Sequence, residues 1–98
     1  MLLCYVDLRS KMTTLNEWNV ESIRIEKATE IYLYGDTYKV SYDTTSKNEY
    51  IEFESITGSI LEFDLTEIRK KLKPYHFKFL SIFTKNNCPS LRFTKNYL

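Results

Sequence analysis

The segment "IYLYGDTYKVSYD", residues 31–43, decides the fold class. Its first four residues are apolar or aromatic, and in its second half Tyr38, Val40 and Tyr42 alternate with polar residues. Alternation with a period of two is typical of a strand that buries one face. A Gly-Asp pair separates the two halves by two residues, which is a favoured length for a tight hairpin turn. We therefore predict a β-hairpin, with strands at residues 31–34 and 37–43.

The same alternation predicts further strands on both sides of this hairpin. Upstream, Ile23 and Ile25 alternate with polar residues, and downstream Ile51 and Phe53 share one face of a strand whose other face carries glutamates. Polar and glycine-containing segments between these runs indicate turns, so the first strands form an antiparallel meander. The additional strands are expected at residues 22–26, 49–55, 76–84 and 90–95, with a loop at 85–89 joining the last two.

One helix is expected between the meander and the last two strands. Leu65, Ile68 and Leu72 form an apolar stripe at helical spacing, and a proline follows at residue 74. Asp64 and Glu67 have the spacing of a capping box, in which each satisfies a backbone N–H at the start of a helix. We predict a helix at 65–73. The fold class is then α+β: a mostly antiparallel sheet of five to seven strands with one short helix packed on it.

A chain of 98 residues with 43% hydrophobic residues is expected to form a single compact domain, residues 1–98. The least certain part is residues 10–19, which read as a loop or as a single helical turn. Trp18 is expected to anchor this part to the core.

The amino terminus and the cysteines indicate a cytoplasmic protein. Asp7 and Arg9 interrupt the first apolar run too early for a signal peptide, and no run approaches the roughly 20 apolar residues that span a bilayer. Cys4 alternates with apolar residues as a buried strand residue would. We therefore expect Cys4 and Cys88 to be reduced thiols, with a disulfide between them as the alternative. No membrane partner is expected.

Charge is divided unevenly along the chain. Residues 1–68 carry a formal charge of −7 and residues 69–98 carry +8, although the whole chain is only +1. The basic part opens with "RKKLKPYHFK", residues 69–78, and mixes cations with aromatic rings. We predict a partner-binding surface in this part, and the candidate residues are Arg69, Lys70, Lys71, Lys73, Tyr75, Lys78, Lys85, Arg92 and Lys95.

This basic segment has two interpretations. Cations interleaved with aromatic rings are used by single-strand nucleic-acid binders to neutralise phosphates and stack on bases. Cations at the end of a helix are also favoured by the helix dipole, and rings at alternate strand positions are typical of a core face. The overall pI of about 7.7 is low for a nucleic-acid-binding domain. Binding to another protein therefore fits the two-signed surface better.

Carboxylates in the acidic part could form a second patch, of the kind that competes with nucleic acid for a basic partner. The alternative is a solvated face of the sheet. The candidate residues are Glu49, Glu52, Glu54 and Glu62.

The sequence contains no recognisable catalytic, metal or cofactor motif. His76 is the only histidine, and with Cys88 it makes at most a two-ligand fragment, whereas zinc sites use three or four ligands. The two glycines are too far apart for a phosphate-binding loop. We predict no catalytic residue, no metal site, no cofactor and no enzymatic activity.

These observations predict a small non-enzymatic protein-binding regulator or inhibitor. A single alanine and ten lysines against four arginines indicate an AT-rich genome, so we expect a phage or mobile-element origin, with a nucleic-acid-processing complex as the target. A homodimer through an exposed edge strand is a further possibility. The alternative function is direct binding of DNA or RNA by segment 69–98, through Lys70, Lys71, Lys73, Lys78, Arg92 and Lys95.

Overall fold

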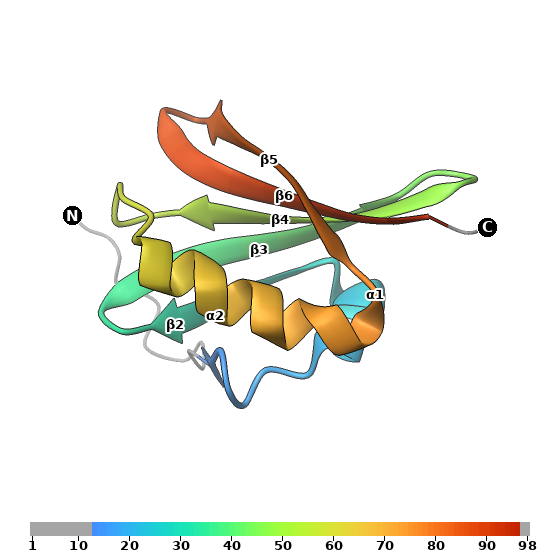
Figure 1. The fold of residues 1–98 in the computed structure, drawn as a ribbon, viewed down its shortest axis with the longest axis horizontal. Coiled ribbons are helices and arrows are strands. Elements are labelled where there is room, and N and C mark those ends of the chain that lie inside the picture. Colours follow the sequence, from blue (N-terminus) through green and yellow to red (C-terminus); the bar gives the residue numbers. More distant parts are fainter. Residues whose placement is uncertain (1–12, 97–98) are drawn as a thin grey trace.

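The computed structural model describes residues 13–96, which form one six-stranded sheet with helices packed against one face (Figure 1). The expectations for Cys4 and its pairing with Cys88 lie outside the described residues. None of the helices in residues 13–96 combines the length and apolar character needed to cross a bilayer.

The strands are β1 (Thr13–Thr14), β2 (Ala28–Leu33), β3 (Asp36–Thr44), β4 (Asn48–Ser55), β5 (Lys78–Lys85) and β6 (Cys88–Asn96). The helices are α1 (Ile23–Glu26), α2 (Glu62–Leu72) and the 3₁₀ turns η1 (Val20–Ser22) and η2 (Lys73–Tyr75).

The sheet confirms the predicted α+β class. Its strand order is β1-β2-β3-β4-β6-β5, and every neighbouring pair is antiparallel except β1 with β2. Strands β2, β3 and β4 form the expected meander. After β4 the chain crosses the sheet as α2, forms the edge strand β5 and returns as β6 between β4 and β5 (Figure 1). Because β4 and β5 are both antiparallel to β6, they run parallel to each other.

The hairpin within residues 31–43 is confirmed, although its turn lies one residue earlier than predicted. Leu33 pairs with Asp36, and Tyr34 and Gly35 both have positive φ, 49° and 88°. Positive φ at both central residues is the geometry of the two-residue turns that match strand twist. The ring of Tyr34 packs on that of Phe63, with centroids 4.7 Å apart, which holds a non-glycine residue in this unfavourable conformation.

The second hairpin is tighter than predicted. Lys85 pairs with Cys88, so the loop expected at 85–89 is a two-residue turn. Asn86 and Asn87 occupy its centre with φ of 52° and 64°. Asparagine tolerates this left-handed region better than most residues, which explains how the turn forms without glycine. Strand β5 begins at Lys78 rather than at residue 76.

The strand predicted at residues 22–26 is wrong, because this segment is helical. Ile23 is buried, whereas Ile25 is 84% exposed, so the two isoleucines do not share a face. The Asn19 side chain accepts a hydrogen bond from the backbone N–H of Glu21 (3.0 Å), which favours a helical turn at this point. Two isoleucines at i and i+2 were too short a pattern to distinguish a strand from one turn of helix.

Helix α2 confirms the predicted helix but starts three residues earlier and lacks the predicted cap. Ile68 and Leu72 are completely buried, as the apolar stripe requires. The residue before the helix is Leu61, which makes no side-chain capping bond. Asp64 lies in the first turn, and its carboxylate accepts a hydrogen bond from Tyr38 in the core (2.7 Å). The capping-box prediction is therefore wrong, because tertiary contacts recruit this carboxylate. With α1, the described residues contain two α-helices, whereas the sequence predicted one.

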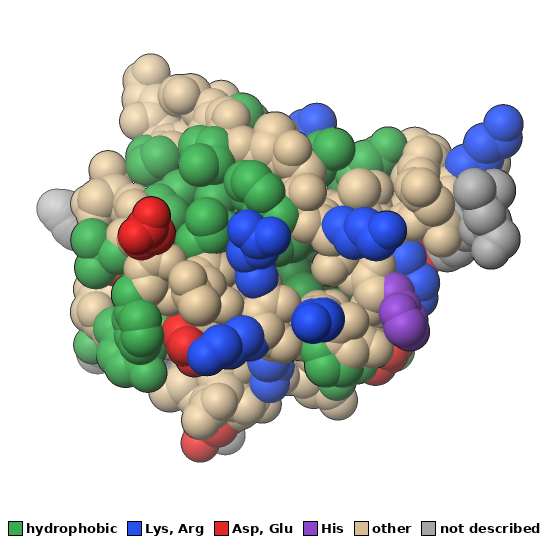
Figure 2. Space-filling model, in the orientation of Figure 1, with side chains coloured by type: hydrophobic (Ala, Val, Ile, Leu, Met, Phe, Trp, Pro, Cys, Tyr) green, Lys and Arg blue, Asp and Glu red, His purple; other side chains and the backbone are tan. Residues whose placement is uncertain are grey.

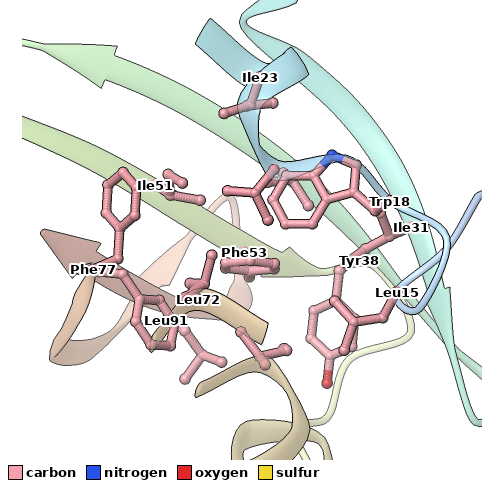
Figure 3. Packing of buried hydrophobic residues seen from close by; sticks show 14 of the residues in the cluster. Leu15, Trp18, Ile23, Ile31, Tyr38, Ile51, Phe53, Leu72, Phe77 and Leu91 are labelled. Carbon is pink, nitrogen blue, oxygen red and sulfur yellow. The ribbon is translucent and has the colours of Figure 1, made fainter. Parts of the chain in front are cut away.

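The core lies between the sheet and α2, and it combines aliphatic side chains with a cluster of aromatic rings (Figure 3). Phe53 is its centre: its ring makes edge-to-face contacts with Trp18, Tyr38 and Phe93 at centroid distances of 6.0, 6.5 and 5.6 Å. Trp18 is 4% exposed, which confirms its predicted anchoring role. Contacts of this geometry are stabilising beyond the burial of their area.

Candidate functional site

A groove runs between α2 and the start of β5, and it gathers four of the predicted partner-binding cations. Its volume is about 590 Å³. Figure 2 shows this face of the molecule, where Lys and Arg side chains gather over α2 and the strand beside it, next to an area of hydrophobic side chains. We call it the α2–β5 groove. Its lining residues are Thr66, Arg69, Lys70, Lys73, Phe77, Lys78, Phe79 and Phe93.

The groove cations are arranged by local structure. Arg69 and Lys70 lie in the last turn of α2, and Lys73 follows in η2, three to four residues further on, so the three side chains are neighbours on the helix surface. The helix dipole favours positive charge at this end. Lys78 opens β5 on the opposite wall. Within residues 13–96, no ion pair joins Arg69, Lys73 or Lys78 to a carboxylate, and Lys70 has only a 3.5 Å contact with Glu67. The groove therefore presents positive charge that the described residues leave largely uncompensated.

The floor of the groove is aromatic and belongs to the core. Phe93 is 1% exposed and Phe77 is 5% exposed, so their ring faces are covered by other side chains. Phe79 is half-buried, with its ring 5.5 Å from that of Phe93. The guanidinium of Arg69 lies 5.5 Å from the centroid of Phe79, in a cation–π contact. The floor therefore offers apolar surface and little free ring face.

Apolar surface continues from the groove along β5. Ile82 pairs with Leu91 of β6, and Leu91 pairs with Phe53, so all three side chains lie on the core face of the sheet. Phe53 and Leu91 are fully buried, yet Ile82 is 60% exposed. Leu80, at an irregularity in the β5–β6 register, is 50% exposed. The described residues thus leave this end of the core face uncovered.

The other predicted partner-binding residues lie outside the groove. Lys85 and Arg92 bind the Glu52 carboxylate on the opposite face of the sheet, at 3.3 and 2.7 Å. The Lys71 ammonium donates to the backbone carbonyl of Asn16 (2.9 Å). The remaining candidates are Tyr75, which packs against the core, and Lys95, which lies near His76 and Lys78.

The predicted acidic candidates do not form one patch. Glu49 is 2% exposed on the core face, where its carboxylate accepts hydrogen bonds from Arg24 (2.8 Å) and Tyr42 (2.9 Å). Glu54 is buried, Glu52 is neutralised by its two cations, and Glu62 is exposed at the start of α2. Because β4 pairs with β6, residues of the acidic part (1–68) lie beside residues of the basic part (69–98). A count of charges along the sequence does not reveal this pairing.

The ion pair of Glu49 connects α1 to the sheet. Burial opposes the charge of Arg24, but its hydrogen bonds and charge interactions with Glu49 and Glu21 outweigh this, so the pKa of Arg24 is raised. Arg24 also lies over the Phe77 ring, 5.9 Å from its centroid. This arrangement is structural, since it fixes the helical segment that the sequence pattern did not predict.

A carboxyl pair, formed by the half-buried Asp36 and the buried Asp64, lies beside the amino end of α2. Asp64 is fully buried, and its Oδ1 has no hydrogen-bond partner in residues 13–96 when both carboxylates are taken as charged; the same is true of Asp36 Oδ2. Asp36 Oδ1 accepts from the Thr57 hydroxyl (3.1 Å), and Asp64 Oδ2 accepts from Tyr38 (2.7 Å). A hydrogen bond between two carboxyl groups requires a proton on one of them. The two orphan oxygens are the positions between which such a proton would lie.

The pKa of Asp64 is raised to about 6, first by burial and then by the hydrogen bond and negative charge of Asp36, against the opposing hydrogen bonds from Tyr38 and the Leu61 backbone. The pKa of Tyr38 is also raised, by burial and then by its hydrogen bond to Asp64. Because Asp64 has no exposed surface, a substrate has no access to it. The pair fastens α2 to β3 rather than acting on a ligand.

In the described part of the chain, no three His, Cys, Asp or Glu side chains gather as a metal-binding group would. No protein-family model, no curated protein and no solved structure matches the chain. The geometry of the described residues is therefore the basis for assigning a role.

Reasoning from the sequence identified the groove cations but missed the exposed apolar residues beside them. Alternation along 76–84 assigns one face to the core and the other to solvent. It does not show that Ile82 lies on the core face and is still exposed, because this depends on the register shift near Leu80 and on where α2 ends. No signal in the sequence alone would have found it.

Proposed function

We propose that this chain is a non-enzymatic protein-binding regulator or inhibitor, and that it binds its partner through the α2–β5 groove. The observation that carries the proposal is the exposed apolar surface that continues from the cation-lined groove along β5, where Ile82 is 60% exposed on the core face. An apolar surface rimmed by polar groups is typical of a protein-interaction site. A nucleic-acid-processing complex of a phage or mobile element remains the proposed target, on the basis of composition and size alone.

The aromatic floor favours a protein partner over a nucleic acid. Stacking on bases requires exposed ring faces, whereas Phe77 and Phe93 are buried and Phe79 already carries the Arg69 guanidinium. A polypeptide can instead place aliphatic side chains against Ile82, which removes apolar surface from water on both sides of the interface.

The second candidate is a direct nucleic-acid binder, and the convergence of four cations in one groove favours it. Backbone phosphates can be neutralised without any stacking. This alternative predicts binding to generic single- and double-stranded DNA that weakens steeply with salt. Absence of binding at about 50 mM salt would eliminate it, because phosphate contacts are strongest at low salt.

The protein-binding proposal is tested by quantitative affinity capture from nuclease-treated extract of the natural host. The bait is the wild-type chain, and the comparison baits are Ile82→Ser and, as a matched control away from the groove, Lys39→Glu. We expect one or more proteins to be retained by the wild type and the control but depleted at least fivefold by Ile82→Ser. Equal recovery on all three baits would contradict the assignment of the groove.

A further inference from the structure

The charge and shape of the α2–β5 groove also indicate the chemistry of its partner. We propose that the groove binds an extended, acidic segment of another protein, with carboxylates beside Lys73 and Lys78 and aliphatic side chains on Ile82. This inference rests on the proposed function and specifies its partner class.

The proposed docking surface has two parts. The groove carries Arg69, Lys73 and Lys78, which have no carboxylate partner within residues 13–96. The apolar surface that continues from it along β5 carries Leu80 and Ile82 and no free cation, since the nearby Lys85 is paired with Glu52. A complementary segment therefore has its carboxylates at one end and its apolar residues at the other.

An extended conformation is favoured by the position of β5 in the sheet. Strand β5 pairs only with β6 among the described strands, so its outer edge has unpaired backbone donors and acceptors. The irregularity near Leu80 interrupts this edge, and the regular part is Ser81–Lys85. A partner strand can pair with this part while its alternate side chains lie over Ile82. At about 3.3 Å per residue, the eight residues of β5 span roughly 26 Å, so a segment of about six to eight residues fits.

Other occupants fit the charges less well. A second copy paired through β5 would bring the same basic segment against the groove, because residues 69–98 carry eight basic and no acidic residues, and like charges repel. The amino-terminal residues 1–12 of the same chain contain one acidic and two basic residues, which does not complement a cationic groove. An acidic segment of a different protein remains the best match.

The test is selection of random twelve-residue peptides on the wild-type chain. We expect the enriched peptides to contain clustered Asp or Glu next to aliphatic residues. Affinity of the best peptide should fall at least tenfold in Lys73→Glu/Lys78→Glu and about fivefold in Ile82→Ser. The control Lys39→Glu/Lys47→Glu makes the same change in net charge at exposed positions away from the groove and should alter affinity less than twofold.

Hydrogen exchange separates strand addition from simple charge attraction. Bound peptide should slow exchange of backbone amides within Ser81–Lys85 by at least tenfold. Enrichment of basic or uncharged peptides, equal loss of affinity in both double variants, or no effect of Ile82→Ser would each overturn the proposed partner chemistry. If affinity capture still depends on Ile82 while selection yields no acidic peptides, the proposed function stands and only this inference fails.

Discussion

At the scale of single residues, the carboxyl pair Asp36 and Asp64 has the most distinctive chemistry. The folded state holds a proton on Asp64 up to a pKa of about 6, whereas the ordinary pKa of an aspartate is 3.8. The folded state therefore binds more protons than the unfolded state between these pH values, and stability decreases as pH rises. The stabilisation is fully present below about pH 4 and is lost as pH passes through about 6.

We expect Asp64→Asn to remove this pH dependence. An asparagine can accept the Tyr38 hydrogen bond and donate to Asp36, so it imitates the protonated carboxyl. Relative to the variant, the wild type should lose on the order of 2 kcal/mol of unfolding free energy between pH 4 and pH 7. Urea unfolding at several pH values measures this difference. Glu62→Gln, an exposed carboxylate on the same helix turn, should leave the wild-type profile unchanged; a parallel change in both variants would refute the role of the carboxyl pair.

At the scale of elements, position 35 of the β2–β3 turn is set by backbone conformation rather than by packing. Gly35 has φ of 88°, and a Cβ built there meets no atom within 4 Å. Gly35→Ala should therefore cost about 1 kcal/mol purely through backbone strain. Gly35→Asn adds a larger side chain but should cost less, because asparagine tolerates positive φ. Thermal unfolding compares the two, and an asparagine variant less stable than the alanine variant would contradict this explanation.

Elements defined by local chemistry could be predicted from the sequence, and those defined by distant contacts could not. The hairpin at 31–43 and the stripe of Ile68 and Leu72 were visible because turn chemistry and periodicity act over a few residues. The segment 22–26 is helical although its isoleucines alternate with polar residues, because a pattern of five residues is too short to exclude a helical turn that buries only Ile23. The position of β6 between β4 and β5, which pairs Glu52 with Arg92, depends on residues 40 apart in sequence. Arg69, Lys70 and Lys73 follow from helical spacing, but the exposure of Ile82 follows from the register shift near Leu80 and from where α2 ends.

At the scale of the whole molecule, β6 connects the two sides of the core. Phe93 is 1% exposed and contacts both Phe53 of β4 and Phe79 of β5, with centroids 5.6 and 5.5 Å away. Phe93→Ala should cost about 3 to 5 kcal/mol in the free energy of unfolding, because it leaves a cavity at this junction. Since a domain of this size is typically stable by only about 5 to 15 kcal/mol, the variant should be close to unfolding.

Urea unfolding measures this cost. The matched control is Phe63→Ala, which removes the same side chain from a site that is 51% exposed. Its cost should be about 1 kcal/mol or less, because little cavity forms at the surface. Equal costs for the two phenylalanines would mean that the junction at β6 is not a centre of stability.

The central place of β6 also has a consequence during synthesis on the ribosome. Strand β4 ends at Ser55 and its neighbour β6 ends at Asn96. About 40 further residues must therefore be synthesised before one edge of β4 can pair with β6. At roughly 5 to 20 residues per second, translation leaves this side unprotected for about 2 to 8 seconds. A nascent chain in that interval carries a strand with an apolar face and an unpaired edge, so codon choice and chaperone access between these positions should influence the yield of folded protein.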